Sequence, residues 1–599
     1  MKAAWKLCVI LLLAGTLAAQ TSEPSKPRKA KAATLTAADV QALKDAIASQ
    51  QAALAQQQQQ IQELRDELHH RDQAVQQAQS AATDAASKAD AAATQASQQQ
   101  QAVGELKGDV TDLKTSLNNT ALTLQETQKS VSESPAALHY KGITITPGGF
   151  LAAEFVRRSR ALGADINTPF NSLAMPGASQ NTLSEFFGSG RQSRISMLAE
   201  GRLKSAKLSG YVEADFLSSG TTSNNNESNS YSLRQRQAWG QAALDNGFTF
   251  TGGQMWSLVT ETKHGMDNRT EALPMTIDPQ YTVGFSWARQ YGLRVTKNFN
   301  NKLWFGFAME NAQATISSHG NASNFVVGSL GNSGGLYNAF NGNYSFNPSP
   351  DLVAKVAFEP GFGHYEVFGI YSRFRDRIFP CVENFASASC DSASAASAAL
   401  ATNESRNGGG VGANARWSFD KKRLDFGLHF LGGDGIGRYG TGGLPDAAVH
   451  ADGTLDPIHS YQGLGTLEWH GPKLDLYANA GAEYDGRAAD YDPLALKVVG
   501  YGAPSFDNSG CYTEAVPGSG GFAPGGLGTK CTADTRVVRE LSLGFWYRLY
   551  TGPKGKFQYG VQYSYADRFA WSGKPTLNLS NQPHGLDGMV FTSFRYYLP

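Results

Sequence analysis

The sequence predicts an all-β transmembrane barrel of sixteen antiparallel strands, preceded by an N-terminal α-helical coiled coil. From Thr146 onward, apolar and polar residues alternate with a period of two, in segments of about ten residues. The connections between these segments are alternately short and long throughout this region. Before it, apolar residues recur at every seventh position, which is the repeat of a coiled coil.

The composition is neutral and rich in glycine. Lys and Arg together number 52, and so do Asp and Glu, among 599 residues, which gives a formal net charge of +0. Because nucleic-acid binding depends on a net-positive surface, we expect no nucleic-acid partner. Charged residues make up 17%, aromatic residues 11%, and 64 residues are glycine, a blend that favours β-structure with long loops. The common hydrolase, zinc-protease, phosphate-loop and calcium-loop motifs are missing, so we expect no enzyme, cofactor or metal.

The chain begins with the organisation of a signal peptide, predicted over residues 1–19. Lys2 and Lys6 flank the start of a short apolar core, and small residues follow that core at a cleavage position. Cys8 lies inside the core, too early for a lipoprotein cysteine, and is expected to leave with it. A Pro/Lys-rich linker is predicted over residues 20–35. No later segment contains about 18 consecutive apolar residues, so no transmembrane helix is expected.

A coiled coil is predicted over residues 36–134, followed by a linker at 135–146. A seven-residue step from Val40 to Val131 meets an apolar residue every time, which argues against a disordered Gln/Ala tract. Both core positions hold only alanine in Ala78–Ala96, so this part is expected to be the weakest. Because the helices of a coiled coil need partners, we expect a parallel homo-oligomer. Polar residues at the companion core positions leave both two and three chains open.

The barrel is predicted over residues 147–599. An even number of strands is typical of bacterial outer-membrane barrels, whose periplasmic turns are short and whose extracellular loops are long. Seven connections are short and eight are longer, so we place the barrel in the outer membrane, surrounded by lipid, with both its ends and the coiled coil in the periplasm. The strands are expected to start near residues 147, 193, 208, 229, 247, 283, 302, 351, 364, 408, 423, 461, 473, 535, 556 and 586.

Four cysteines follow the signal peptide, and an even number in an exported chain indicates two disulfides. Three sets of pairings are possible. We favour Cys381–Cys390 and Cys511–Cys531, because each pair lies within one predicted loop. A zinc site is the weaker interpretation, since no Cys-x-x-Cys and no histidine at ligand spacing lies nearby.

The alternation also predicts which side chains face the lumen. In "LSLGFWYRL", residues 541–549, the apolar residues at odd positions oppose Trp546 and Arg548, as expected for an apolar outer wall around a water-filled interior. The same rule assigns to the lumen the basic residues Arg194, Arg202, Arg234, Arg236, Arg294, Lys355, Arg416, Arg548 and Arg595. It also assigns to the lumen the acidic residues Glu200, Glu213, Asp215, Glu310, Glu359, Glu468, Asp475 and Glu540.

The segment "YSLRQRQAW", residues 231–239, carries the strongest functional expectation. Arg234 and Arg236 lie two positions apart, and a local basic cluster in a low-dielectric wall favours anions. The alternative is that these arginines pair with acidic residues and only brace the wall. The outer face of the strand is predicted to hold Leu233, Gln235, Gln237 and Trp239. Because glutamine is a poor neighbour of lipid, this strand is expected to lie at a subunit interface.

The connection Thr260–Thr282 is a candidate constriction loop. It carries Lys263, His264, Arg269 and Glu271, charged or titratable groups that would line a pore if the loop folded inward. An ordinary extracellular loop is the alternative.

Several stretches resemble landmarks of the DcaP-like outer-membrane porins. "EADFLSS", "SLRQRQAWGQ", "FTFTGGQMWSLVTE", "ARQYGLRVT" and "FAMENAQ" are similar to successive segments of that family, over roughly Arg194 to Asn311. The resemblance implies a trimeric sixteen-stranded porin with a periplasmic coiled coil, which passes small anionic solutes such as dicarboxylates. It also implies pore arginines at Arg234, Arg236, Arg194 and Arg294.

The chain departs from the family pattern in two places, at Gln237 and at Met255, and these changes bear on the substrate more than on the fold. Phosphate-selective porins also join a coiled coil to a sixteen-stranded barrel, so a phosphate-type anion pore is an alternative. A further alternative is a barrel whose long stalk contacts the cell wall and tethers the envelope, with permeation secondary.

Overall fold

The computed structural model of the chain describes residues 138–218, 231–317, 325–327, 345–380, 399–493, 496–514, 516, 530–574 and 582–599. The predicted signal peptide, Pro/Lys-rich linker and coiled coil (residues 1–134) lie outside the described residues, as do Cys381 and Cys390.

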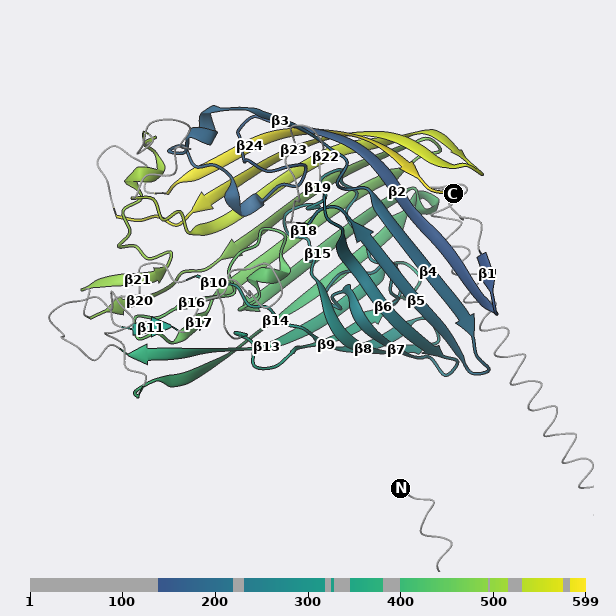
Figure 1. Cartoon of the computed structure of the whole chain (residues 1–599), viewed down its shortest axis with the longest axis horizontal. Helices are drawn as coiled ribbons and strands as arrows, with labels where there is room; N and C mark the ends of the chain where they lie inside the picture. The colour runs from purple at the N-terminus through teal and green to yellow at the C-terminus, as the bar shows by residue number, and fades with distance from the viewer. Residues whose placement is uncertain are drawn as a thin grey trace, which may run out of the picture. The chain divides into compact units, whose positions relative to one another are not determined.

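Sixteen of the described strands form one closed antiparallel barrel (Figure 1). In ring order they are β2 (Ile143–Arg158), β4 (Arg194–Arg202), β5 (Ala206–Asp215), β6 (Arg234–Leu244), β7 (Phe248–Trp256), β8 (Arg289–Phe299), β9 (Leu303–Glu310), β12 (Asp351–Phe358), β13 (His364–Pro380), β14 (Thr402–Phe419), β15 (Leu424–Asp434), β18 (His459–His470), β19 (Leu474–Asp485), β22 (Thr535–Gly552), β23 (Gly555–Ala570) and β24 (His584–Tyr597). The ring closes where β24 pairs with β2, from Phe150 opposite Tyr597 to Arg158 opposite Met589.

Each predicted strand corresponds to one strand of the ring, so the predicted barrel is confirmed. The first residues of two strands differ most from the predicted positions. β14 begins at Thr402 instead of near residue 408, because its first residues are polar and show no alternation. β8 begins at Arg289 instead of near residue 283, because the residues before it leave the wall and enter the lumen.

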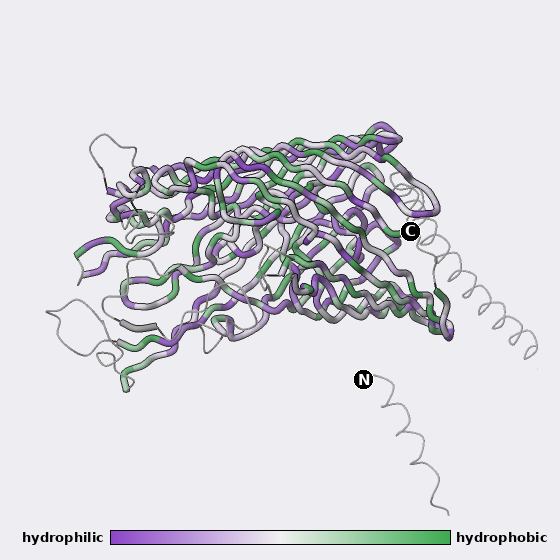
Figure 2. The backbone as a smooth tube through the Cα atoms, turned by 45° about the horizontal axis from the view of Figure 1, so that its top comes forward, coloured by the Kyte–Doolittle hydropathy of each residue, from purple (hydrophilic) through white to green (hydrophobic). Residues whose placement is uncertain are grey.

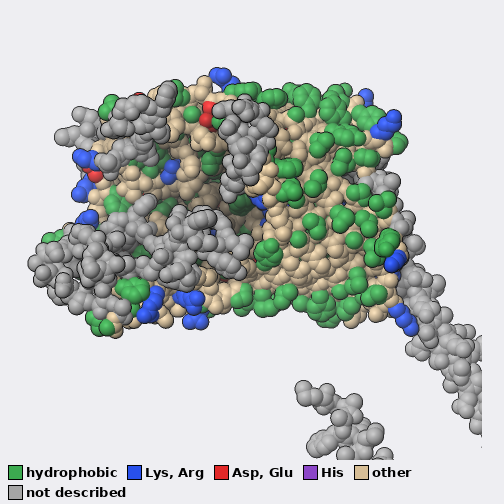
Figure 3. Space-filling model, viewed as in Figure 1, with side chains coloured by type: hydrophobic (Ala, Val, Ile, Leu, Met, Phe, Trp, Pro, Cys, Tyr) green, Lys and Arg blue, Asp and Glu red, His purple; other side chains and the backbone are tan. Residues whose placement is uncertain are grey.

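The outer wall is apolar. Leu541, Leu543 and Leu549 are exposed on β22, whereas Ser542 and Arg548 are buried on its other face, which confirms the predicted facing. Figure 2 shows the same alternation of hydrophobic and hydrophilic residues along the strands. In Figure 3, hydrophobic side chains gather on the wall at the end where the short turns lie. An apolar outer belt around a polar interior is typical of a barrel that spans a membrane.

The β5–β6 pair contains a β-bulge that changes this facing. Glu213 lies opposite Gln237 and Ala214 lies opposite Gln235, so Arg236 is an extra residue on β6. Beyond the bulge the parity reverses, and both Gln237 and Trp239 turn inward, with Trp239 only 7% exposed. The prediction that these two residues face outward is therefore wrong.

The longer connections carry the remaining described elements, several of which gather at the end of the barrel opposite β1 (Leu138–Tyr140) (Figure 1). They are β3 (Glu185–Ser189), β10 (Ile316–Ser317), β11 (Phe325–Val327), β16 (Ala447–Val449), β17 (Leu455–Pro457), β20 (Ala488–Asp492), β21 (Lys497–Tyr501) and the 3-10 helices η1 (Phe170–Ser172), η2 (Ser179–Thr182), η5 (Gly437–Tyr439) and η6 (Ser509–Cys511). The short strand β1 (Leu138–Tyr140) pairs with β2, and η4 (Asp420–Lys422) forms one short turn. Within the part of the chain that the structure describes, no helix has the length and apolar character needed to cross a membrane.

One disulfide lies among these longer connections. Cys511 at the end of η6 is bonded to Cys531, in the connection between β21 and β22. The same segment is tied to the connection between β2 and β4, since the Gly177 amide donates to the Cys511 carbonyl at 2.7 Å.

Candidate functional site

The connection between β7 and β8, residues 257–288, lies inside the barrel, and we call it the inner loop. Near its start, the amide of Leu258 donates to Oε1 of Glu310 on β9 at 2.7 Å. Further along, the amide of Ile277 donates to Oε1 of Gln562 on β23 at 2.6 Å. Because β9 and β23 stand on opposite sides of the ring, the inner loop crosses the lumen from one wall to the other.

Two glycines allow the inner loop to approach the wall closely. Gly265 and Gly284 have φ of 52° and 84°, a conformation that other residues rarely adopt. A Cβ atom at Gly265 would lie 2.7 Å from the ring of Trp304, and one at Gly284 would collide with the carbonyl oxygen of Gly463. Both positions therefore require glycine while the loop stays against β9 and β18.

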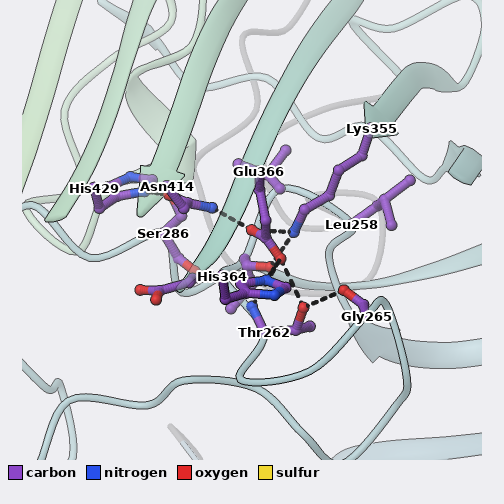
Figure 4. Close-up of polar contacts among 12 residues, drawn as sticks. Leu258, Thr262, Gly265, Ser286, Lys355, His364, Glu366, Asn414 and His429 are labelled. Atoms are coloured by element: carbon purple, nitrogen blue, oxygen red, sulfur yellow. Dashed lines mark hydrogen bonds and ion pairs between the residues drawn. The ribbon is translucent and has the colours of Figure 1, made fainter. Parts of the chain in front are cut away.

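A buried polar cluster fastens the inner loop to the wall (Figure 4). We call it the wall anchor: Thr262, Lys355, His364, Glu366 and Asn414. The Glu366 carboxylate on β13 accepts from the Thr262 hydroxyl at 2.6 Å, from Lys355 Nζ at 2.6 Å and from Asn414 Nδ2 at 2.5 Å. His364 Nε2 lies 3.0 Å from the same carboxylate. The buried negative charge is thus matched by basic groups and hydrogen bonds, which is the condition under which a buried carboxylate is tolerated.

Two further ion pairs hold the loop on the same side of the lumen. Arg416 on β14 donates through Nε to Oε1 of Glu261 at 2.7 Å. His264 Nδ1 lies 2.8 Å from Oε2 of Glu359, which follows β12. Arg416, which was predicted to line the pore, and His264, which belongs to the candidate constriction loop, therefore serve to hold the inner loop in place.

The predicted arginines of β6 form a compact charge cluster with β5, the arginine wall. Asp215 accepts from Arg234 through Nε at 2.9 Å and Nη2 at 2.8 Å, and from Arg236 Nη1 at 2.8 Å. Arg236 also donates to Glu213 at 2.6 Å and to the Tyr281 hydroxyl of the inner loop at 3.2 Å. The Arg236 side chain is only 1% exposed, whereas that of Arg234 is 31% exposed. Arg236 thus braces the wall, while Arg234 is paired and still reaches water.

The arginine wall has more cations than carboxylates. Arg194 on β4 lies 3.6 Å from Glu213, and the Arg289 guanidinium lies 4.7 Å from the ring centre of Trp256. The Nη1 atom of Arg289 has no hydrogen-bond partner among the described residues. The guanidinium groups of Arg194, Arg234 and Arg236 therefore face the two carboxylates of Glu213 and Asp215, which leaves a surplus of one positive charge, and Arg289 lies beside them over Trp256.

Two other predicted arginines lie away from this cluster. Arg202 lies at the short-turn end of β4, where its Nη2 donates to Oδ1 of Asp245 at 2.9 Å and the side chain is exposed. Arg294 on β8 is buried and donates to Oδ1 of Asn268 at 2.9 Å and to the Trp256 carbonyl. Arg294 therefore supports the inner loop from the wall behind it.

The remaining predicted residues of the inner loop differ in their exposure. Lys263 is half-buried, and its amide donates to the Thr270 carbonyl at 2.7 Å. Arg269 is exposed, and its guanidinium lies 5.1 Å from the ring centre of Tyr211 on β5. Arg269 thus adds another positive group beside the arginine wall.

The sequence prediction did not include Arg289 and Tyr281. Arg289 has the parity of outward-facing Tyr291 and Leu293, and Tyr281 falls in a segment without periodicity. An arginine at an outward parity is itself a signal, because a charge facing lipid is unfavourable.

Comparison with known proteins gives structural matches. No family model matches the chain, and no curated protein matches it significantly. The outer membrane channel DcaP of Acinetobacter baumannii aligns with a TM-score of 0.51 and 14% identity, over 77% of this chain and 100% of DcaP. OmpT of Vibrio cholerae aligns with a TM-score of 0.38 and 11% identity, over 77% of this chain and 99% of OmpT. An anion-selective porin from Comamonas acidovorans aligns with a TM-score of 0.37 and 11% identity, over 76% of this chain and 100% of that porin.

The likeness to DcaP shows a shared fold, while the two looser alignments carry no weight. The resemblance to DcaP-like porins read from the sequence is therefore confirmed at the level of the sixteen-stranded barrel.

Proposed function

We propose that the protein is an outer-membrane porin for passive diffusion of small hydrophilic anions. The closed barrel, its apolar outer wall and its polar, charged interior support a water-filled path across a membrane. The shared fold with an outer membrane channel agrees with this role.

The surplus positive charge of the arginine wall is the observation that carries the anion preference. In a narrow channel with low-dielectric walls, a fixed charge attracts counter-ions and raises their local concentration. Arg234 is partly exposed while its Nε and Nη2 atoms are held by Asp215, which keeps its plane in a fixed orientation. A planar guanidinium suits carboxylate and phosphate oxygens, so dicarboxylates are the proposed solutes and phosphate is the alternative.

We propose a homotrimer with the coiled coil of residues 36–134 in the periplasm. The heptad repeat of that segment requires partner helices. On the outer wall, Gln235 Nε2 donates to Gln254 Oε1 at 3.1 Å and to the Tyr291 hydroxyl at 3.0 Å. This polar patch on β6 to β8 is unsuited to lipid and supports a contact between subunits there.

The reversal potential in planar bilayers under a salt gradient tests the proposal. The native protein is expected to prefer anions, and Arg234→Gln is expected to weaken that preference. Arg202→Gln removes the same charge from the lumen's short-turn end, away from the arginine wall, and serves as the matched control. A cation preference in the native protein, or no conductance, would count against the proposed function. An unchanged reversal potential in Arg234→Gln would show that Arg234 only braces the wall.

A further inference from the structure

A second cluster of charged side chains lies in the lumen, at the short-turn end of β15 and β18. Asp425, Glu468 and His470 each present one ligand atom there, and these atoms lie within 4.8 Å of one another. His470 Nε2 lies 3.4 Å from Asp425 Oδ2 and 3.5 Å from Glu468 Oε2. The proposed porin activity does not involve these residues.

The register of the sheet produces this arrangement. Asp425 on β15 lies directly opposite Glu468 on β18, so both carboxylates leave the sheet on the lumen face. His470 is two residues beyond Glu468 and has the same facing, because side chains of a strand alternate. A Glu-x-His pair on one strand and an aspartate on its neighbour thus converge on one point.

The separations suit a shared cation. Charge-assisted N–H···O bonds are usually about 2.7–2.9 Å long, and both histidine–carboxylate distances exceed that. Zinc bonds to histidine nitrogen and carboxylate oxygen measure about 2.0–2.2 Å, so ligand atoms at tetrahedral angles lie roughly 3.3–3.5 Å apart. The cluster reproduces that spacing for two of its pairs.

The neighbouring residues orient these ligand atoms. The other ring nitrogen of His470, Nδ1, lies 3.3 Å from Oδ1 of Asp475, and Arg548 holds both oxygens of that aspartate. The Ser418 hydroxyl donates to Asp425 Oδ1 at 2.7 Å, which leaves Oδ2 turned toward His470. A carboxylate behind a histidine that binds metal fixes the tautomer and raises the basicity of the ligand nitrogen.

We propose that Asp425, Glu468 and His470 bind a divalent transition metal ion of the zinc type at the short-turn mouth of the lumen. One nitrogen and two oxygens are ligands that zinc accepts, and three protein ligands leave a coordination position for water. The Asp425 side chain is 22% exposed, so the ion has a route in from the lumen. The competing arrangement is a protonated His470 held between the carboxylates, without metal.

Zinc titration of the purified full-length chain by calorimetry, and cobalt substitution followed by visible absorption, test the proposal. We expect saturable zinc binding and the absorption of tetrahedral cobalt, with affinity lowered at least about tenfold in His470→Asn and in Asp425→Asn. Asp475→Asn should weaken binding by about tenfold while leaving the three ligands in place.

His459→Asn is the matched control, because His459 begins the same strand at the opposite end and lies 2.6 Å from Asp434. It should bind zinc as the native chain does. Each ligand variant must first be shown to fold, by the change in electrophoretic migration that heating causes in a folded barrel. Two ligand variants are used so that the test still holds if one of them misfolds. No zinc binding by the native chain, or equal binding by both folded ligand variants, would overturn the proposal in favour of the protonated histidine.

Discussion

Replacing Glu366 by glutamine should release the inner loop from the wall of β12 to β14. The carboxylate accepts from the Thr262 hydroxyl and pairs with Lys355, and both charged side chains are fully buried. The amide keeps the size but leaves the Lys355 ammonium without its counter-charge. Removing one partner of a buried pair costs about 3–5 kcal/mol. At about 1.4 kcal/mol per factor of ten, the detached state of the loop gains roughly two to three and a half powers of ten in population.

Single-channel recording and trypsin digestion of the folded barrel measure this release. A detached inner loop should raise the conductance and its noise, and should expose the backbone after Lys263 and Arg269 to cleavage. The double variant Lys355→Met with Glu366→Leu removes both charges together, so the loop should be released less than in Glu366→Gln, although the Thr262 hydroxyl still loses its acceptor. Native conductance and native trypsin resistance in Glu366→Gln would refute the idea that the wall anchor holds the loop.

Three further predictions follow from facing and charge. Leu541→Arg should lower the free energy of unfolding in lipid vesicles, measured by urea titration, by about 2 kcal/mol, because it puts a charge on the lipid face. Trp239→Ala should cost about 3–5 kcal/mol in the same urea titration, since Trp239 packs inside against Tyr211 and Met255; a loss below about 1 kcal/mol would place it outside after all. Burial lowers the pKa of His264, but its hydrogen bond to Glu359 outweighs this and raises the pKa above the ordinary value. The stabilisation is therefore full below about pH 6.5 and lost as pH rises through the raised pKa, so trypsin resistance of the loop should fall with pH in the native chain and stay flat in His264→Asn.

Alternation allowed the strands and most of their facing to be predicted, because lipid and water impose opposite demands on successive residues. On β22 this rule holds from Leu541 to Leu549. It failed at Trp239 because the bulge at Arg236 adds one residue, which exchanges the two faces of the strand for every residue that follows. The alternation of residue types does not reveal where such a bulge occurs. Trp239 looked suitable for lipid and is equally suitable for an aromatic contact with Tyr211.

The candidate site was predictable only where strands build it. Arg234 and Arg236 lie on the lumen face by parity, and pairing with Glu213 and Asp215 was an open alternative that the structure adopts. Tyr281 depends on the path of the inner loop, which is set by contacts with strands far away in the sequence. No local pattern encodes such contacts.

The crossing of the lumen by the inner loop separates two tasks that a plain barrel must combine. The ring of strands meets the requirements of the bilayer, while a segment that never touches lipid crosses the lumen from one wall to the other. In the proposed porin, the number of strands alone would therefore not set the exclusion limit. Substitutions within residues 257–288 would then change the size limit of the proposed pore without disturbing insertion of the barrel into the membrane.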